Sequence, residues 1–468
     1  MKYRITDFGA IADGKTLCSQ AVQKAVDFCY KNGGGIVRFG RGRYVLSTVF
    51  LRSNITIEIP AGTEILGAES YYDYAQEEKV EYPIYQDSSH TYFHPSLFVG
   101  IGCENVKITG GGKIDMRSVW DEDGVRGEAI KHRGAKCIAL KNCRNVEISN
   151  LEIYNATDLA VHFAGCENVD VHGLKMRVYI DGISPDNSKN VRIHDCDVET
   201  GDDGIVFKSS YTLNRIDICK DIKVWNCKIK SRCNAIKFGT ETNGGFENIS
   251  LENIQIKDTR ITGISIESVD GAIVDGIAIK NVVMQNVNAP LFIHLGKRMR
   301  GPQGREIGQI KNVALENITA TGPYKPYEIM PWNYFSWKEN DCYQTPKVFG
   351  IAESFDGTKP TDDWQMTSNI CGLKESPLQN ITLKNVHLKL DGGVKTYNRN
   401  VPEDAQDYPE VYVYGRILPA KGIYFRHIEG LTLENVTVDT YREDAREDFV
   451  FDDVVGKALR EGQEDGRV

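Results

Sequence analysis

Three aspartates in two short motifs are the residues of this chain best suited to acid–base chemistry. Asp181 stands in Tyr-Ile-Asp-Gly, while Asp202 and Asp203 stand in Gly-Asp-Asp-Gly, 21 and 22 residues further on. If about 21 residues make one coil of a repetitive fold, these side chains lie on neighbouring strands whose backbones are about 5 Å apart. Such carboxylates perturb one another, so that one can hold a proton near neutral pH while another is ionised. Hydrolysis of a glycosidic bond needs that division, an acid for the leaving oxygen and a base for water.

The same motifs have a simpler explanation. Asp-Gly and Asp-Asp-Gly are common turn sequences, and either acid alone could serve only to cap a turn. Three acids that converge at the spacing of one coil favour the catalytic interpretation.

Polar residues on the following coils extend the same wall. If Ile236 and Ile266 point inward, strand alternation turns Lys237 and Glu267 outward, beside Lys208. These side chains could line a substrate groove, or they could form a solvated ladder of Lys–Glu pairs. The predicted substrate-binding residues along the wall and its loops are Lys208, Asn234, Lys237, Glu267, His294, Arg298, Trp332 and Trp337. His294 has an alternative role as a packed histidine, and the two tryptophans could pack their loop instead of stacking on sugar rings.

A short repeat positions these residues. The unit Cys-x-Asn-Val begins at Cys103, Cys143 and Cys166, and related copies continue to Glu429-Gly430-Leu431. Each copy opens a strand in which apolar, mostly β-branched residues alternate with polar ones. A period near 22 residues built from such strands predicts an all-β fold, a right-handed parallel β-helix. The recurring Asn could form an amide ladder along the axis, or it could merely tolerate the turn backbone.

The cysteines follow the repeat. None of the 12 shows the paired spacing of a zinc or redox motif. We expect them to be small buried side chains at one corner of successive coils, and we predict neither a metal site nor a cofactor.

One domain is expected over residues 1–456. Apolar residues at helical spacing predict a capping helix over 19–31, which would cover the open end of the solenoid. The ranges 322–375 and 392–422 lack strand alternation and are expected to be projecting loops, and 457–468 is expected to be a charged tail.

Composition excludes several classes of partner. The net charge of -9 and the absence of a basic run argue against nucleic acid. No stretch has the roughly 20 apolar residues of a membrane span. The start lacks an apolar signal-peptide core, so a cytoplasmic location is expected unless a leader was removed. An oligosaccharide or polysaccharide is the expected partner, and the sequence leaves monomer and homo-oligomer open.

At these motifs the sequence resembles glycoside hydrolase family 28, the polygalacturonases and rhamnogalacturonan hydrolases. The family's G-x-G-x-I-D pattern matches Gly110 to Asp115, its N-T-D-G matches Tyr179 to Gly182, and its G-D-D matches Gly201 to Asp203. The resemblance implies an inverting hydrolase with Asp202 as general acid, while Asp181 and Asp203 activate water.

Two departures affect the substrate. The family's G-H-G falls on Cys233-Asn234-Ala235, and its R-I-K falls on Ser265-Ile266-Glu267, so both basic residues are missing. That basic pair would hold a substrate carboxylate, which Glu267 would repel. The reactive sugar is therefore neutral, or Lys208, Lys237 or Arg298 meets its carboxylate.

The expected function is exo-acting hydrolysis of pectin-derived or related plant oligosaccharides. Two other classes stay open on the same fold. A lyase or epimerase would abstract a proton next to a uronate carboxylate, commonly with Ca²⁺ or a basic residue. A noncatalytic carbohydrate-binding β-helix is the third possibility.

Overall fold

A computed structural model describes residues 1–119, 133–325, 365–403 and 408–460. Its residues fall into two compact units, Met1–Lys228 and Ile229–Val468. The strands of both units are parallel and stack coil on coil, which confirms the predicted all-β, right-handed parallel β-helix. The expectation of one domain over residues 1–456 stays a prediction. None of the helices among the described residues is long and apolar enough to cross a membrane.

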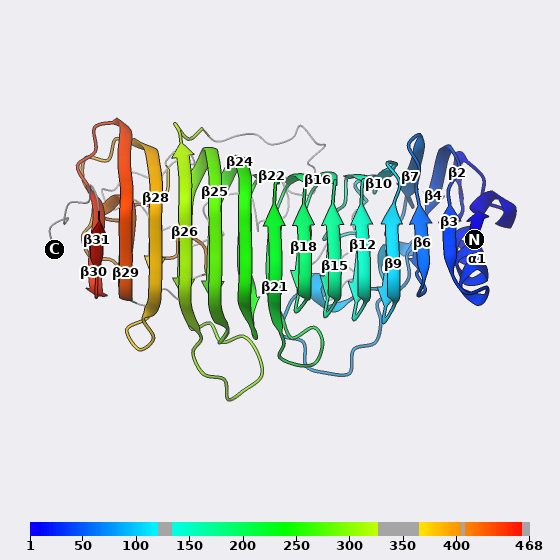
Figure 1. Cartoon of the computed structure of the whole chain (residues 1–468), viewed down its shortest axis with the longest axis horizontal. Coiled ribbons are helices and arrows are strands. Elements are labelled where there is room, and N and C mark those ends of the chain that lie inside the picture. The colour runs from blue at the N-terminus through cyan, green and yellow to red at the C-terminus, as the bar shows by residue number, and fades with distance from the viewer. Residues whose placement is uncertain (120–132, 326–364, 404–407, 461–468) are drawn as a thin grey trace. The chain divides into compact units, whose positions relative to one another are not determined.

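Unit 1 consists of three parallel stacks of strands, one for each side of the coil. The first stack, whose members lie side by side in Figure 1, contains β1 (Lys2–Arg4), β3 (Gly35–Arg38), β6 (Ile55–Glu58), β9 (Glu104–Thr109), β12 (Arg144–Ser149), β15 (Glu167–His172), β18 (Lys189–His194) and β21 (Ile218–Trp225). The second contains β2 (Asp13–Leu17), β4 (Gly42–Leu46), β7 (Thr63–Gly67), β10 (Lys113–Asp115), β13 (Glu152–Tyr154), β16 (Lys175–Val178) and β19 (Asp197–Thr200). The third contains β5 (Val49–Phe50), β8 (Ser96–Ile101), β11 (Lys136–Lys141), β14 (Val161–Ala164), β17 (Ile183–Asp186) and β20 (Ile205–Ser209).

Alternation along each strand fills the core. In β15, Val169 and Val171 are buried and pair in register with Val191 and Ile193 of β18. The residue between them, Asp170, points outward. Like side chains therefore stack on like side chains from coil to coil, which is how a short apolar repeat builds a continuous core.

An asparagine ladder follows one corner of unit 1. Asn54, Asn105, Asn145, Asn168 and Asn190 have φ between 52° and 62°, the left-handed region that Asn tolerates better than most residues. Their side-chain amides also bond one another: each of the last four donates to the side-chain oxygen of the one before it, over 2.6–3.0 Å. The two explanations left open by the sequence are both correct.

The corner cysteines are buried thiols. Cys103, Cys143, Cys166 and Cys219 are 0–6% exposed and form no disulfide. The backbone amide of Cys143 donates to the sulfur of Cys166 over 3.3 Å. This is the packing role expected from their place in the repeat.

Helix α1 (Ser19–Lys31) occupies the residues whose spacing predicts a helix. It buries Val22, Ala25, Val26 and Cys29 and packs against β1, β3 and β5. It ends where Gly33 and Gly34 adopt positive φ, and the Gly34 amide donates to the Cys29 carbonyl. The described ranges also contain three short helices, η1 (Ile5–Phe8), η2 (Tyr71–Asp73) and α2 (Ser88–Thr91).

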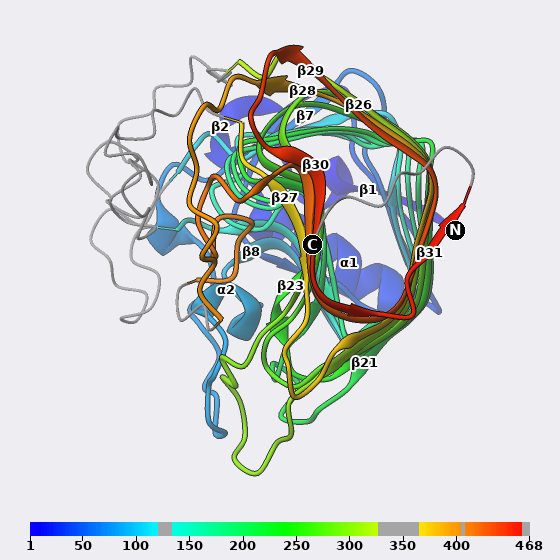
Figure 2. The same cartoon turned by 90° about the vertical axis from the view of Figure 1, so that its left-hand side faces the viewer.

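Unit 2 continues the same construction with longer strands that run through the corners of the coil. After β22 (Lys228–Ser231), which contains the boundary between the units, its strands are β23 (Asn234–Thr242), β24 (Gly245–Ser268), β25 (Ile273–Leu295), β26 (Gln309–Thr321), β27 (Ser368–Cys371), β28 (Leu378–Gly392), β29 (Ala420–Arg442), β30 (Glu447–Val455) and β31 (Ala458–Arg460). Figure 2 views the last coil end-on, with β29, β30 and β31 along its outline. A second amide ladder joins Asn253, Asn281, Asn317, Asn385 and Asn435.

Three expectations for the C-terminal half are wrong in part. Strand β27 lies inside the range 322–375 expected to be a loop; its four residues are too few to show alternation. Within 392–422, Val411 to Tyr414 and Leu418 do not project but are buried in one cluster with Phe292 and Tyr424. Strand β31 lies in the expected tail 457–468 and pairs with β29, so the first residues of this tail belong to the sheet.

Candidate active site

The three aspartates of the two acidic motifs come together in unit 1. They lie just before β17 and β20, two neighbouring strands that pair Ile183 with Ile205. The Gly182 amide donates to the Asp203 carbonyl over 3.0 Å, and the Asp203 amide donates to Oδ1 of Asp181 over 3.2 Å. The coil is therefore 22 residues long here, and Asp203, not Asp202, is the direct neighbour of Asp181. The expected one-coil step of 21 residues was wrong by one position.

The three aspartates are largely buried, although the sequence predicts them on a wall that faces solvent. Asp181 and Asp203 are each 4% exposed, whereas the side chain of Asp202 is 13% exposed. Burial, followed by the nearby charge of Asp202, raises the pKa of Asp181 well above its usual value, and Lys208 and Arg133 oppose that rise. The group can therefore hold a proton at a pH where an ordinary carboxyl is ionised.

Arg133 is a site residue that the sequence did not reveal. Its guanidinium lies 3.7 Å from Oδ2 of Asp202 and 3.9 Å from Oδ1 of Asp158, and it donates to Oγ of Ser89 over 3.1 Å. The side chain keeps 13% exposure, equal to that of Asp202. Arg133 precedes β11 outside any repeat motif, so no pattern in the chain signals its position.

A buried ion pair stands behind Arg133. Lys136 and Asp158 are both fully buried, 3.1 Å apart, and Lys136 also donates to the Tyr92 carbonyl over 2.9 Å. The second oxygen of Asp158 accepts from the Leu159 amide over 2.8 Å. These partners satisfy both charges, as a buried pair requires.

Lys208, the predicted binding residue of unit 1, is 5% exposed and pairs in register with Asp186 on β17. Its charge reaches the aspartates, since it lowers the pKa of Asp181. The structure therefore brings Lys208 to the acidic group, although it is buried and not on an open groove.

In unit 2, Lys237 and Glu267 form a buried cluster. They lie 3.6 Å apart at 3% and 0% side-chain exposure, so the solvated Lys–Glu ladder is wrong. Glu410, which the sequence did not single out, bonds Lys237, and its Oε1 accepts from Nδ2 of Asn234 over 3.2 Å. The carboxylates of Glu267 and Glu410 thus share the Lys237 ammonium. Glu410 lies 173 residues further along the chain, and it covers Lys237 on the side of the strand that the sequence predicts to face solvent.

His294 and Arg298 have structural partners in unit 2. His294 is 3% exposed and stacks on Phe292, and burial lowers its pKa to about 4. Arg298 forms a two-pronged ion pair with Asp270, at 2.9 and 2.5 Å. Both therefore contribute to the fold; His294 is buried, whereas the side chain of Arg298 is 23% exposed and its predicted binding role stays a prediction. Trp332 and Trp337 lie outside the described residues.

A set of possible metal ligands also lies in unit 1. One ligand atom from each of His90, His162 and Asp186 lies within 4.8 Å of the other two, and all three residues are buried.

Curated proteins resemble this chain over part of its length. A probable polygalacturonase of Vitis vinifera is 26% identical over 52% of this chain and 52% of its own. The exo-poly-alpha-D-galacturonosidase of Dickeya chrysanthemi is 23% identical over 52% of this chain and 48% of its own. The chain thus spans about half the length of these relatives.

Solved structures share the fold. An exopolygalacturonase from Thermotoga maritima superposes with a TM-score of 0.64 at 20% identity, covering 84% of this chain and 87% of that one. A family 28 exopolygalacturonase from Yersinia enterocolitica superposes with a TM-score of 0.66 at 19% identity, covering 98% of this chain and 78% of that one. The sequence itself matches the profile of glycosyl hydrolases family 28 over residues 51–329, more than half of its length. That match contains both acidic motifs, and this chain belongs to glycosyl hydrolases family 28.

Proposed function

We propose that this protein hydrolyses glycosidic bonds in pectin-derived oligosaccharides, from the chain end and with inversion at the reacting carbon. The observation that carries the proposal is the meeting of Asp181, Asp202 and Asp203 within one coil step, with the pKa of Asp181 raised. Family membership and the polygalacturonase relatives support the substrate class. Exo action is supported by the name of the Dickeya chrysanthemi relative.

The three carboxylates have different surroundings, and we assign their roles accordingly. Asp202 is the most exposed and is the one that a leaving-group oxygen can reach, so it is the general acid. Asp181 and Asp203 are linked and deeper, and they activate water. Because the three carboxyls lie within one coil step, a proton held by the group in the free enzyme is close to the leaving-group oxygen.

Arg133 supports a uronate as the reacting sugar. The family's basic pair is replaced by Ser265 and Glu267, but Arg133 brings a guanidinium to within 3.7 Å of Asp202. A guanidinium has five N–H donors in a planar fork that matches a carboxylate. Arg133 is thus the cation of unit 1 best placed to meet a substrate carboxylate beside the general acid.

Product analysis with a panel of pectic oligosaccharides tests the proposal. Hydrolysis yields new reducing ends, and NMR of the first product shows the inverted anomer. An unsaturated product would instead identify a lyase, and binding without turnover would identify a carbohydrate-binding protein; either result overturns the proposal.

Two variants separate the acid from the base. Asp202→Asn should lower kcat on natural oligosaccharides by a factor of roughly 10²–10⁴. It should recover on an aryl glycoside whose phenol leaves without protonation, whereas Asp181→Asn should not. Asp197→Asn, an exposed aspartate on β19, is the matched control and should keep full activity. Equal loss of activity on both substrates in Asp202→Asn would contradict its role as acid.

A further inference from the structure

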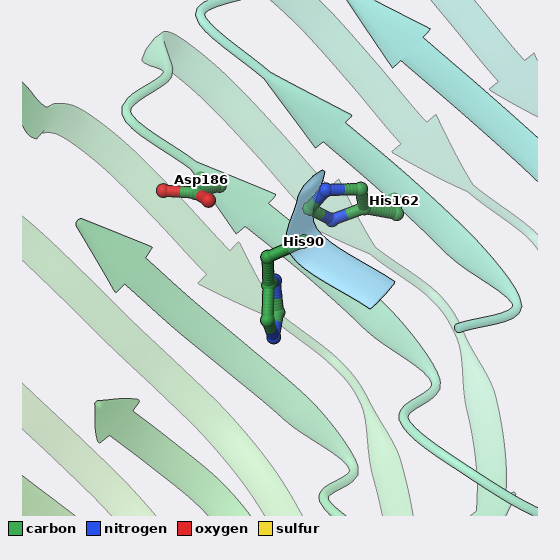
Figure 3. Close-up of side chains that lie close together, drawn as sticks. All are labelled: His90, His162 and Asp186. Atoms are coloured by element: carbon green, nitrogen blue, oxygen red, sulfur yellow. The ribbon is translucent and has the colours of Figure 1, made fainter. Parts of the chain in front are cut away.

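His90, His162 and Asp186 come from three separate segments of unit 1. Figure 3 shows His162 and Asp186 on the neighbouring strands β14 and β17, with His90 from α2 beside them. In the register of these strands His162 lies opposite Ser184, and Ala164 opposite Asp186. Side chains two residues apart share a face of a strand, so His162 and Asp186 point to the same side of the sheet.

His162 is held in the form that a metal ligand needs. Nδ1 lies 3.2 Å from the Ser184 carbonyl and 3.3 Å from the Ser184 hydroxyl. The carbonyl can only accept, so we assign the proton to Nδ1. Nε2 then has a lone pair, and it is buried without a hydrogen-bond partner among the described residues.

Asp186 is oriented from behind by Ser210. The Ser210 amide donates to Oδ1 over 2.9 Å, and the Ser210 hydroxyl donates to Oδ2 over 2.5 Å. A carboxylate oxygen has two lone pairs, so each oxygen can accept one bond and still coordinate a cation. Hydrogen bonds of this kind, behind a histidine and behind a carboxylate, are the usual supports of metal ligands.

We propose that His90, His162 and Asp186 bind one divalent transition-metal ion of the zinc class. Two imidazoles and one carboxylate suit zinc, whereas calcium and magnesium prefer oxygen ligands throughout. Bonds of about 2.1 Å in tetrahedral geometry put ligand atoms about 3.4 Å apart. In the structure, the three ligand atoms lie within 4.8 Å of one another, so metal binding would draw the three side chains closer together.

The site is structural, although it adjoins the acidic group, since Asp186 pairs in register with Lys208. All three ligands are at most 2% exposed, which leaves no opening for a substrate. The neighbouring cation Lys136 is neutralised by Asp158 at 3.1 Å. His90 of α2 and Phe93, two residues after α2, both contact the ring of His162, with ring centroids 5.4 and 5.2 Å away, so the ion would fasten this segment to the sheet.

Metal content tests the proposal directly. The full chain, made without a polyhistidine tag and stripped with a chelator, is titrated with Zn²⁺ and Co²⁺. We expect about one equivalent per chain, a tetrahedral Co²⁺ absorption spectrum and a rise in Tm with Zn²⁺ that Mg²⁺ and Ca²⁺ do not give. No tight binding of either ion would overturn the proposal.

Variants locate the ion. His90→Gln should abolish stoichiometric binding, and Ser210→Ala, which keeps all three ligands, should weaken it about tenfold or more. His387→Gln, at a half-buried histidine of unit 2, is the control and should bind as the wild type does. Circular dichroism checks that each variant is folded. Unchanged binding in folded His90→Gln would show that the metal sits elsewhere and would overturn the assignment.

Discussion

The backbone amide of Asp203 donates a hydrogen bond to the carboxylate of Asp181, the residue one coil before it. The bond ties the side chain of Asp181 to the main chain of the next coil, so the geometry of the acidic group depends on the stacking of β17 and β20. The same stacking buries the carboxyl of Asp181 among like charges. A cost in stability follows at any pH where these groups ionise.

Asp181→Asn should stabilise the protein at neutral pH. Since the folded-state pKa of Asp181 is raised, its contribution to stability is fully present below the unfolded pKa near 4 and is lost as pH rises through the folded value. The variant should gain on the order of 1–3 kcal/mol at pH 7, and the gain should vanish at pH 3. Urea denaturation at both pH values measures it. An equal gain at both pH values would mean that ionisation is not the cause.

Arg133→Met should discriminate between acidic and neutral sugars. Charge-assisted hydrogen bonds to a carboxylate contribute about 1.5–3 kcal/mol. We therefore expect kcat/KM on a galacturonate oligosaccharide to fall roughly 10- to 100-fold, mainly through KM, with little change in binding of neutral sugar oligomers. Arg144→Met, on the exposed face of β12, is the control. A fall of the same size on both substrate types would argue that Arg133 only positions Asp202.

Lys136→Met should lower the free energy of unfolding more than the substitution of a surface lysine does. Removing one partner leaves the Asp158 charge buried and unpaired, which costs about 3–5 kcal/mol. Lys107→Met breaks a half-exposed pair with Glu147 and should cost at most about 1 kcal/mol. The double variant Lys136→Met with Asp158→Leu should recover much of the loss. Denaturant midpoints decide, and no recovery would show that the individual hydrogen bonds matter more than the charges.

Asn168→Gly and Asn168→Ala should separate the two roles of the ladder. Glycine keeps the left-handed backbone and loses only the amide bonds to Asn145 and Asn190, for about 1 kcal/mol. Alanine also adds left-handed strain and should cost about 1–2 kcal/mol more. Thermal unfolding compares the pair. Equal losses would show that the backbone conformation at this corner is not strained.

The repeat made the fold predictable. Each Cys-x-Asn-Val corner sets the start of a strand, and alternation then determines which residues enter the core, as Val169 and Val191 do. The helix at 19–31 and the meeting of the three aspartates followed from spacing alone. The one-residue error in pairing arose because adjacent aspartates offer two equally plausible partners for Asp181.

Contacts from distant segments were not predictable. Alternation shows which side chains leave the core, but not what covers them: α2 lies over His162, and Glu410 meets Lys237 from 173 residues away. Arg133 and β27 belong to no repeat corner. The burial of the predicted outward face, and with it the charge balance of the site, therefore required the three-dimensional structure.

The asparagine corners restrict which residues the repeat can accept. Asp221 continues the corner of Asn190 with φ of 57°, and Gly276 and Gly430 take the places beside Asn248 and Asn380 with φ of 73° and 79°. Asp and Gly both tolerate a left-handed backbone, and the two glycines have no side-chain amide to extend the ladder. These corner positions thus accept Asn, Asp or Gly. The left-handed backbone is required there, whereas the side-chain amide is not.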